Sequence, residues 1–147
     1  MKAKELVKNA KKKIVISGWR REVEEIRKEL ISAKKRGIEN TIFSFTKMDE
    51  KLGKIVSYEL SESDLRKIWT PKIIMIVDNQ HTIMGSTKKT EDCKAILTKN
   101  TAINEIATNH IILDITLAGR RLGFESDSYV KNIMRDPAEN LQHLLNV

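Results

Sequence analysis

Cysteine is almost missing from this sequence, and its apolar runs are short. The single cysteine, Cys93, can form no intrachain disulfide and has no second thiol for a Cys-x-x-Cys metal site. We interpret Cys93 as a small apolar strand residue rather than a reactive thiol. An apolar run such as IIMIV at 73–77 is far shorter than the roughly 20 residues of a membrane span. The N-terminus also lacks an apolar stretch of the signal-peptide type, so we expect a soluble, cytoplasmic protein with no membrane partner.

Aromatic residues are also few, at 5%, which bears on the meaning of the positive charge. Of the formal charge of +7, residues 1–13 carry +5, which leaves only +2 for the rest of the chain. A nucleic-acid interface would more often show a basic stripe with interleaved aromatics. We therefore expect residues 1–12 to form a basic linker helix that leads from an upstream module, with a plain surface helix as an equal alternative.

The remaining residues, 13–147, are numerous and apolar enough for one domain with a real core. KIVISGW is a strand pattern broken by glycine, and residues 20–37 place Val23, Ile26, Leu30 and Ala33 on one helical face. IENTIFSF is the next strand pattern. A strand, helix and strand of this length predict a right-handed crossover between parallel strands, and hence an α/β fold with a mixed sheet flanked by helices.

The second half of the chain alternates between short strands and helices. Two strands, IIMIVD and HTIMGS, surround an Asp78-Asn79 turn, and KAILT is a further strand. Weaker patterns predict a strand at 54–60 and a short capped helix at 61–69. Residues 101–119 form a long helix whose apolar residues cover more than one face, which indicates a core helix or one shared with a partner chain. One or two short helices interrupted at Pro137 end the chain.

No histidine lies in a motif of fixed spacing, so histidine catalysis is not indicated. We interpret His110 as a satisfied structural histidine, since its helix is rich in apolar residues, and we find no motif around His81 or His143. Neither metal-ligand spacing nor a glycine-rich phosphate loop occurs. We expect no metal and no cofactor.

A ligand site is expected at the carboxyl ends of the strands, where open α/β sheets bind their ligands. Six residues are candidates there, and their basic members favour an anion: Ser17, Trp19, Arg20, Ser44, Ser86 and Lys88. The structural alternatives are strong, because serines also satisfy backbone groups and Trp19 suits a core or rim position. We interpret Asp78 as a turn or cap residue, Asp114 as a hydrogen-bonded structural residue and Trp69 as a core residue.

The segment from Pro71 to Lys88 resembles the second half of the phospholipase D signature, His-x-Lys, four residues, Asp, six residues, then Gly-Ser-x-Asn. In that family the histidine is the nucleophile, the lysine holds phosphate and the aspartate supports the site. Asp78, Gly85 and Ser86 match the signature, whereas Pro71 stands in the place of the histidine, Ile73 in that of the lysine and Lys88 in that of the asparagine. The resemblance implies a fold without the catalytic pair, because neither proline nor isoleucine can attack or neutralise phosphate.

A broader resemblance covers KKKIVISGWRREVEEIRKELISAKKRG, IIMIVDNQHTIMGS and AILTKNTAINEIATNHIILDI. These runs resemble the effector domain of TrmB-type transcriptional regulators, which follows a winged-helix DNA-binding domain and a helical linker and has a degenerate phospholipase-D-like fold. Two positions depart from the family pattern: the family commonly has a tryptophan where Leu97 stands and a histidine where Leu113 stands. The matching positions are Trp19, Asp78, Gly85, Thr98, Asn100, Asp114 and Ile115.

The resemblance implies a non-catalytic, ligand-sensing and homodimerising domain, with a small anionic or sugar-like effector and with DNA bound only through the upstream winged-helix domain. The apolar face of residues 101–117 favours a homodimer as well. Two alternatives stay open: a phosphodiesterase or nuclease assembled across a dimer, and a free-standing protein-interaction domain.

Overall fold

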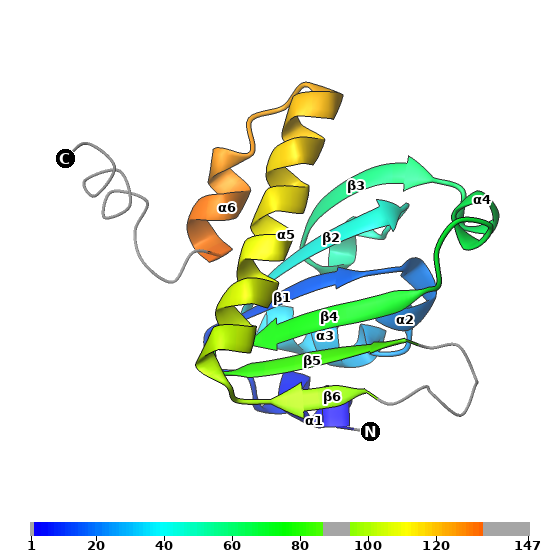
Figure 1. Cartoon of the computed structure of the whole chain (residues 1–147). Helices are drawn as coiled ribbons and strands as arrows, with labels where there is room; N and C mark the ends of the chain where they lie inside the picture. The colour runs from blue at the N-terminus through cyan, green and yellow to red at the C-terminus, as the bar shows by residue number, and fades with distance from the viewer. Residues whose placement is uncertain (1, 87–94, 134–147) are drawn as a thin grey trace.

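A six-stranded mixed sheet forms the centre of the molecule in this computed structural model, which describes residues 2–86 and 95–133 (Figure 1). The strand order is β3-β2-β1-β4-β5-β6. Strands β1, β2 and β3 are parallel to one another, whereas β4 is antiparallel to β1, β5 to β4 and β6 to β5. The strands are β1 (Lys13–Gly18), β2 (Glu39–Thr46), β3 (Lys54–Leu60), β4 (Lys72–Val77), β5 (His81–Ser86) and β6 (Ile96–Thr98).

The predicted crossover between parallel strands is confirmed by the pairing of β1 with β2. The connecting helix is not continuous as predicted, but consists of α2 (Arg20–Glu24) and α3 (Arg27–Lys35). Ile26 lies between them with φ −110° and ψ 18°, outside helical geometry. The predicted apolar face is nevertheless buried, with Val23, Ile26, Leu30 and Ala33 at most 1% exposed. The apolar spacing does not reveal the interruption, because both helices bury the same stripe.

Helices cover both faces of the sheet. Behind the sheet in Figure 1 lie α1 (Lys2–Asn9), α2 and α3, which enclose one core with the side chains of Ile14, Ile16 and Ile42. In front lie α5 (Thr101–Leu122) and α6 (Asp127–Ile133), over a second core that contains Val15, Phe43 and Ile76. Alternate residues of β1 thus enter different cores, as the period of a strand requires.

Helix α1 is packed on the domain and does not extend away from it. Val7 is fully buried and Ala10 is 6% exposed within the core behind the sheet. The Arg36 guanidinium donates hydrogen bonds of 3.1 Å to the carbonyls of Val7 and Lys8, at the end of α1. Cations are favourable at a helix C-terminus because the last carbonyls have no partner within the helix. The C-terminal end of α1 is therefore bonded to Arg36, directly after α3.

The front face is only partly covered by the described residues. Figure 1 shows α5 crossing one half of the sheet, while the half nearest α4 (Glu62–Arg66) has none of the described helices in front of it. Helix α5 also exposes large apolar side chains, with Ile106 and Leu113 each 67% exposed. In the described residues, no helix is long and apolar enough to cross a membrane.

Candidate functional site

A cavity of about 340 Å³ lies where β1 and β2 end, on the part of the sheet that α5 leaves open. The ends of β1 and β2, the start of β4, the segment after α4 and one side of α5 all contribute to it. Its walls are formed by Ser17, Gly18, Trp19, Ser44, Phe45, Trp69, Lys72, Ile74, His110 and Asp114. The cavity lies at the carboxyl ends of the parallel strands, where such sheets hold ligands.

The strand residues of the cavity differ in how well their polar groups are satisfied. The Ser44 hydroxyl, 1% exposed, lies 3.0 Å from the Thr46 hydroxyl and accepts the Thr46 N–H at 3.1 Å. The half-buried Ser17 hydroxyl has no hydrogen-bond partner among the described residues. Trp19 is 3% exposed and anchors the end of β1 in the core. Ser17 therefore has hydrogen-bonding capacity for a ligand, while Ser44 has less.

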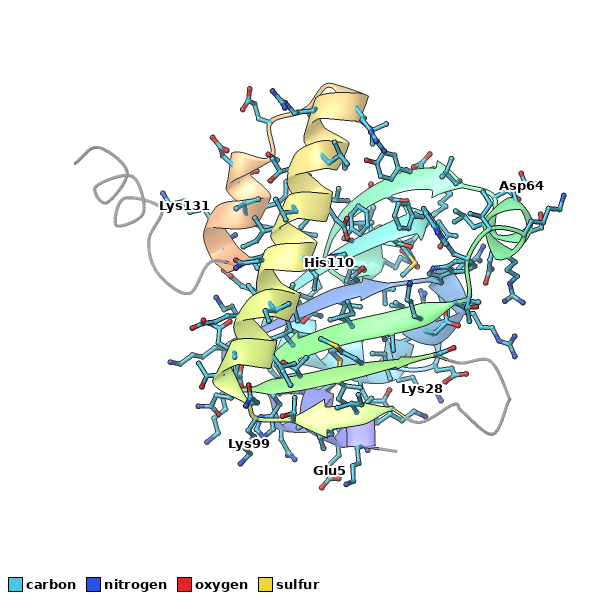
Figure 2. The ribbon with its side chains drawn as sticks, viewed as in Figure 1. Glu5, Lys28, Asp64, Lys99, His110 and Lys131 are labelled. Atoms are coloured by element: carbon cyan, nitrogen blue, oxygen red, sulfur yellow. The ribbon has the colours of Figure 1, made fainter. Side chains whose placement is uncertain are left out.

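Helix α5 contributes His110 and Asp114, which lie close together, to the opposite wall. His110 Nε2 lies 3.3 Å from Asp114 Oδ2, and these positions are one helical turn apart. His110 extends from α5 toward the side on which α4 lies (Figure 2). Burial raises the pKa of the Asp114 carboxyl, and the nearby His110 opposes this shift only in part. Asp114 is thus a partly desolvated carboxylate, and a further hydrogen-bond donor would stabilise its charged form.

Two residues from β4 and its preceding loop complete the cavity. The Lys72 ammonium forms no ion pair or hydrogen bond with the described residues. Trp69 was expected in the core, but it is 48% exposed. Its ring packs on Phe45 at a centroid distance of 5.3 Å, so it forms part of the cavity wall instead. The expectation was wrong because Trp69 lies in the loop between α4 and β4, where its ring contacts the partly buried Phe45 at the rim of the front core and stays half exposed.

The other candidate residues lie elsewhere. Arg20 is exposed and lines a different depression beside Glu24 and Asp49, while its backbone N–H donates to the Thr46 hydroxyl at 3.0 Å. Ser86 pairs with Lys72 across β4 and β5 but is not part of the cavity wall. Lys88, Cys93, Pro137 and His143 lie outside the described residues.

The interpretation of His110 as a satisfied structural histidine does not agree with the structure, since 59% of its side chain is exposed. Sequence reasoning did not include Trp69, Lys72, His110 or Asp114 among the ligand residues. The periodicity of β4 could have predicted one feature of the site, because Lys72 and Ile74, two positions apart in a strand, point to the same face of the sheet. No local pattern places that face beside α5.

Asp78 lies at the opposite end of the sheet from the cavity. It follows β4 in a turn with φ 54°, and its carboxylate accepts the backbone N–H groups of Lys11, Lys12 and Lys13 at 2.9, 2.7 and 3.0 Å. Burial alone would raise the pKa of Asp78, but the three N–H donors together hold it below its ordinary value. Asp78 thereby joins the β4–β5 turn to the segment that connects α1 with β1.

Ile73 and Gly85, two positions compared with the phospholipase D signature, lie in packed surroundings. Ile73 packs against the core behind the sheet, next to Gly18, whereas Lys72 and Ile74 face the cavity. Gly85 is retained where a Cβ atom would come within 3.1 Å of the Ala95 side chain, so a larger residue would press on the chain beside β5. Among the described residues, no cluster of three or more His, Cys, Asp or Glu side chains could hold a metal ion.

Comparisons with known proteins agree with this geometry. Residues 1–109 match the family model described as the transcriptional regulator TrmB, EBD N-terminal subdomain. No curated protein sequence matched the chain. Among solved structures, TrmBL2, described as an archaeal chromatin protein with a novel mode of DNA binding, is similar with a TM-score of 0.54 and 14% identity. The match covers 75% of this chain and 45% of TrmBL2, so this chain spans less than half of that protein.

Two further solved structures are similar to about the same degree. NucT from Helicobacter pylori has a TM-score of 0.55 at 13% identity, with 78% of this chain and 86% of that chain covered. Nuc from Salmonella typhimurium, described as a phospholipase D family member, has a TM-score of 0.52 at 18% identity, with 74% and 80% covered. These likenesses show the fold alone. The fold class predicted from the sequence is confirmed, and the family model shows that this chain belongs to the TrmB family of transcriptional regulators.

Proposed function

We propose that this chain is the non-catalytic, ligand-sensing and homodimerising domain of a TrmB-like regulator. DNA would be bound through a winged-helix domain outside this sequence. The similarity to TrmBL2, whose description names DNA binding, supports the regulatory role. The replacement of the catalytic pair by Pro71 and Ile73 supports the absence of catalysis.

The observation that carries the proposal is an apolar stripe on α5. Its residues follow one another at intervals of three and four positions, the spacing that places side chains on one face of a helix. His110 lies within the stripe, beside the cavity. The apolar members and their exposed fractions are Ile103 (37%), Ile106 (67%), Leu113 (67%) and Leu117 (43%).

The opposite face of α5 packs the helix against the sheet. Ala107, Ile111, Ile115 and Ala118 are at most 1% exposed against the sheet. The stripe is therefore not required by the core, and an exposed apolar face of this extent suits an interface between chains. A two-fold dimer would set α5 against its copy and would match the two-fold symmetry common in DNA sites.

We expect Ile106→Glu to convert the domain to a monomer in sedimentation velocity at micromolar concentration, because a glutamate on the stripe must lose its hydration to enter an interface. Ile68→Glu is the matched control, since Ile68 is 70% exposed and follows α4, away from the stripe. At protein concentrations low enough for the unmodified domain to be monomeric, both variants should unfold within about 0.5 kcal/mol of it, because both sites are exposed in the single chain.

A purely monomeric unmodified domain would contradict the dimer. So would a dimer that Ile106→Glu leaves intact, or one that Ile68→Glu disrupts to the same degree.

A further inference from the structure

The cavity beside α5 contains two charges of opposite sign that do not satisfy each other. Lys72 reaches it from the start of β4 and Asp114 from α5. No ion pair within 4.0 Å joins them, and among the described residues the one basic side chain within 4.0 Å of the Asp114 carboxylate is His110. Both groups are therefore available to a third molecule.

This pair of charges selects against simple ligands. An anion without a donor group would meet the partly desolvated carboxylate of Asp114, and a cation would meet Lys72, so each would lose affinity. A ligand with an anionic group at one end and a hydroxyl or ammonium donor at the other would satisfy both. The unpartnered Ser17 hydroxyl supplies a further donor and acceptor on the same wall.

The remaining wall suits a short carbon skeleton. Trp69 and Phe45 present packed aromatic rings, and Ile74 lies beside them. Tryptophan at a half-exposed position offers a large apolar surface with little loss of side-chain entropy on binding. A volume of about 340 Å³ lies at the lower end of the roughly 300–1,000 Å³ of small-molecule sites, so the cavity fits a small ligand.

We propose that this cavity binds a small carboxylic acid that also carries a hydroxyl or amino group, with the carboxylate at Lys72 and the donor group at Asp114. The inference rests on the proposed sensing function and specifies its ligand class. The positions of His110 and Asp114 on α5, next to the apolar stripe, would place such a ligand beside the proposed dimer interface.

The two tryptophans of the chain, Trp19 and Trp69, both line the cavity, so their fluorescence reports on its occupancy. The probes are six-carbon compounds: gluconate with a carboxylate and hydroxyls, 6-aminohexanoate with a carboxylate and an ammonium, hexanoate with the carboxylate alone, and sorbitol with hydroxyls alone. We expect gluconate, 6-aminohexanoate or both to shift the emission at millimolar concentration. Hexanoate and sorbitol should bind at least about tenfold more weakly, because each leaves one charged group of the cavity unpaired.

Two variants test the assigned contacts. Lys72→Met should weaken binding of the effective probe at least about tenfold, and Asp114→Asn, nearly isosteric, should reduce its preference over hexanoate. Lys67→Met and Asp64→Asn are the controls; these residues lie on α4 or directly after it, outside the cavity wall, and should change nothing. Circular dichroism and urea unfolding of every variant would exclude a change of fold.

The proposal would be overturned if no probe shifts the emission, if hexanoate or sorbitol binds as well as the other two, or if both cavity variants bind like the unmodified protein. Sedimentation of the same samples separates the two proposals. A dimer without any fluorescence response overturns the cavity assignment alone, whereas a monomer that responds selectively overturns the dimer alone.

Discussion

At the scale of single residues, Asp78 has a structural role in this fold. Asp78 accepts three backbone N–H groups, and its own N–H donates to the Lys13 carbonyl at 2.8 Å. Consecutive N–H groups of this kind form an anion-binding concavity, which is filled here by a side chain of the protein itself. The aspartate therefore stabilises the start of β1 at the end of the sheet that lies away from the cavity.

At the residue scale, we expect Asp78→Asn to lower the free energy of unfolding at pH 7 by about 1–2 kcal/mol, because an amide oxygen replaces a charged acceptor. The pKa of Asp78 is depressed in the folded state, so its contribution exists above the unfolded pKa and is lost as pH falls through the folded pKa. The difference between the two proteins should therefore shrink in urea unfolding experiments carried out in acid.

Asp64→Asn is the control for this measurement. Asp64 is exposed and its contact with Lys67, 3.7 Å long, is worth little in water. An Asp78→Asn effect that persists unchanged in acid, or one no larger than that of Asp64→Asn, would contradict the assigned role.

At the scale of the element, α5 has two faces with different tasks. One face packs against the sheet and is fastened to β5 by a hydrogen bond of 3.1 Å from the Asn104 amide to the Thr82 hydroxyl. The other face carries the apolar stripe and part of the cavity wall. The helix begins at Asn100, whose side chain accepts the Ile103 N–H at 3.0 Å, and ends at Gly123 with φ 77°. These caps satisfy backbone groups at both ends of the helix.

An isoleucine-to-alanine substitution on each face tests the different roles of the two faces. We expect Ile111→Ala to lower the free energy of unfolding by about 2–4 kcal/mol, because Ile111 is fully buried and its truncation leaves a cavity in the core. Ile106→Ala should cost less than about 0.5 kcal/mol in a monomeric sample, since Ile106 is 67% exposed. Urea unfolding at low protein concentration measures both; equal costs would contradict the assignment of the two faces.

At the scale of the whole molecule, the fold resembles phospholipase D proteins while the chain belongs to a family of regulators. We expect no hydrolysis of bis(p-nitrophenyl) phosphate above the buffer rate, because loss of a nucleophile alone commonly costs a factor of about 10⁴ or more. The measurement needs protein purified to homogeneity, since a trace of contaminating phosphodiesterase would imitate activity. Turnover that disappears in Ser86→Ala would contradict the non-catalytic assignment.

Much of the fold could be predicted from local patterns. The strand, helix and strand at the start of the chain determine a parallel pair, and Gly37, with φ 88°, stands just past α3, where a glycine commonly ends a helix. Only part of the candidate site could be predicted. Ser17, Trp19 and Ser44 follow from the rule that ligands bind at strand ends. Lys72 shares a face with Ile74, but no local pattern assigned that face to the site, and Trp69 was assigned to the core.

By itself, the sequence determined the order of the strands and of the longer helical segments, and the residues at each position of the signature, because periodicity and residue identity act locally. Only the tertiary structure decided that α1 packs on α3, that Trp69 forms a cavity wall, and that Lys72 and Asp114 share one cavity without pairing. The last two residues are far apart in the chain. Their meeting depends on how α5 packs across the sheet, which is set by the burial of both cores together and not by any segment alone.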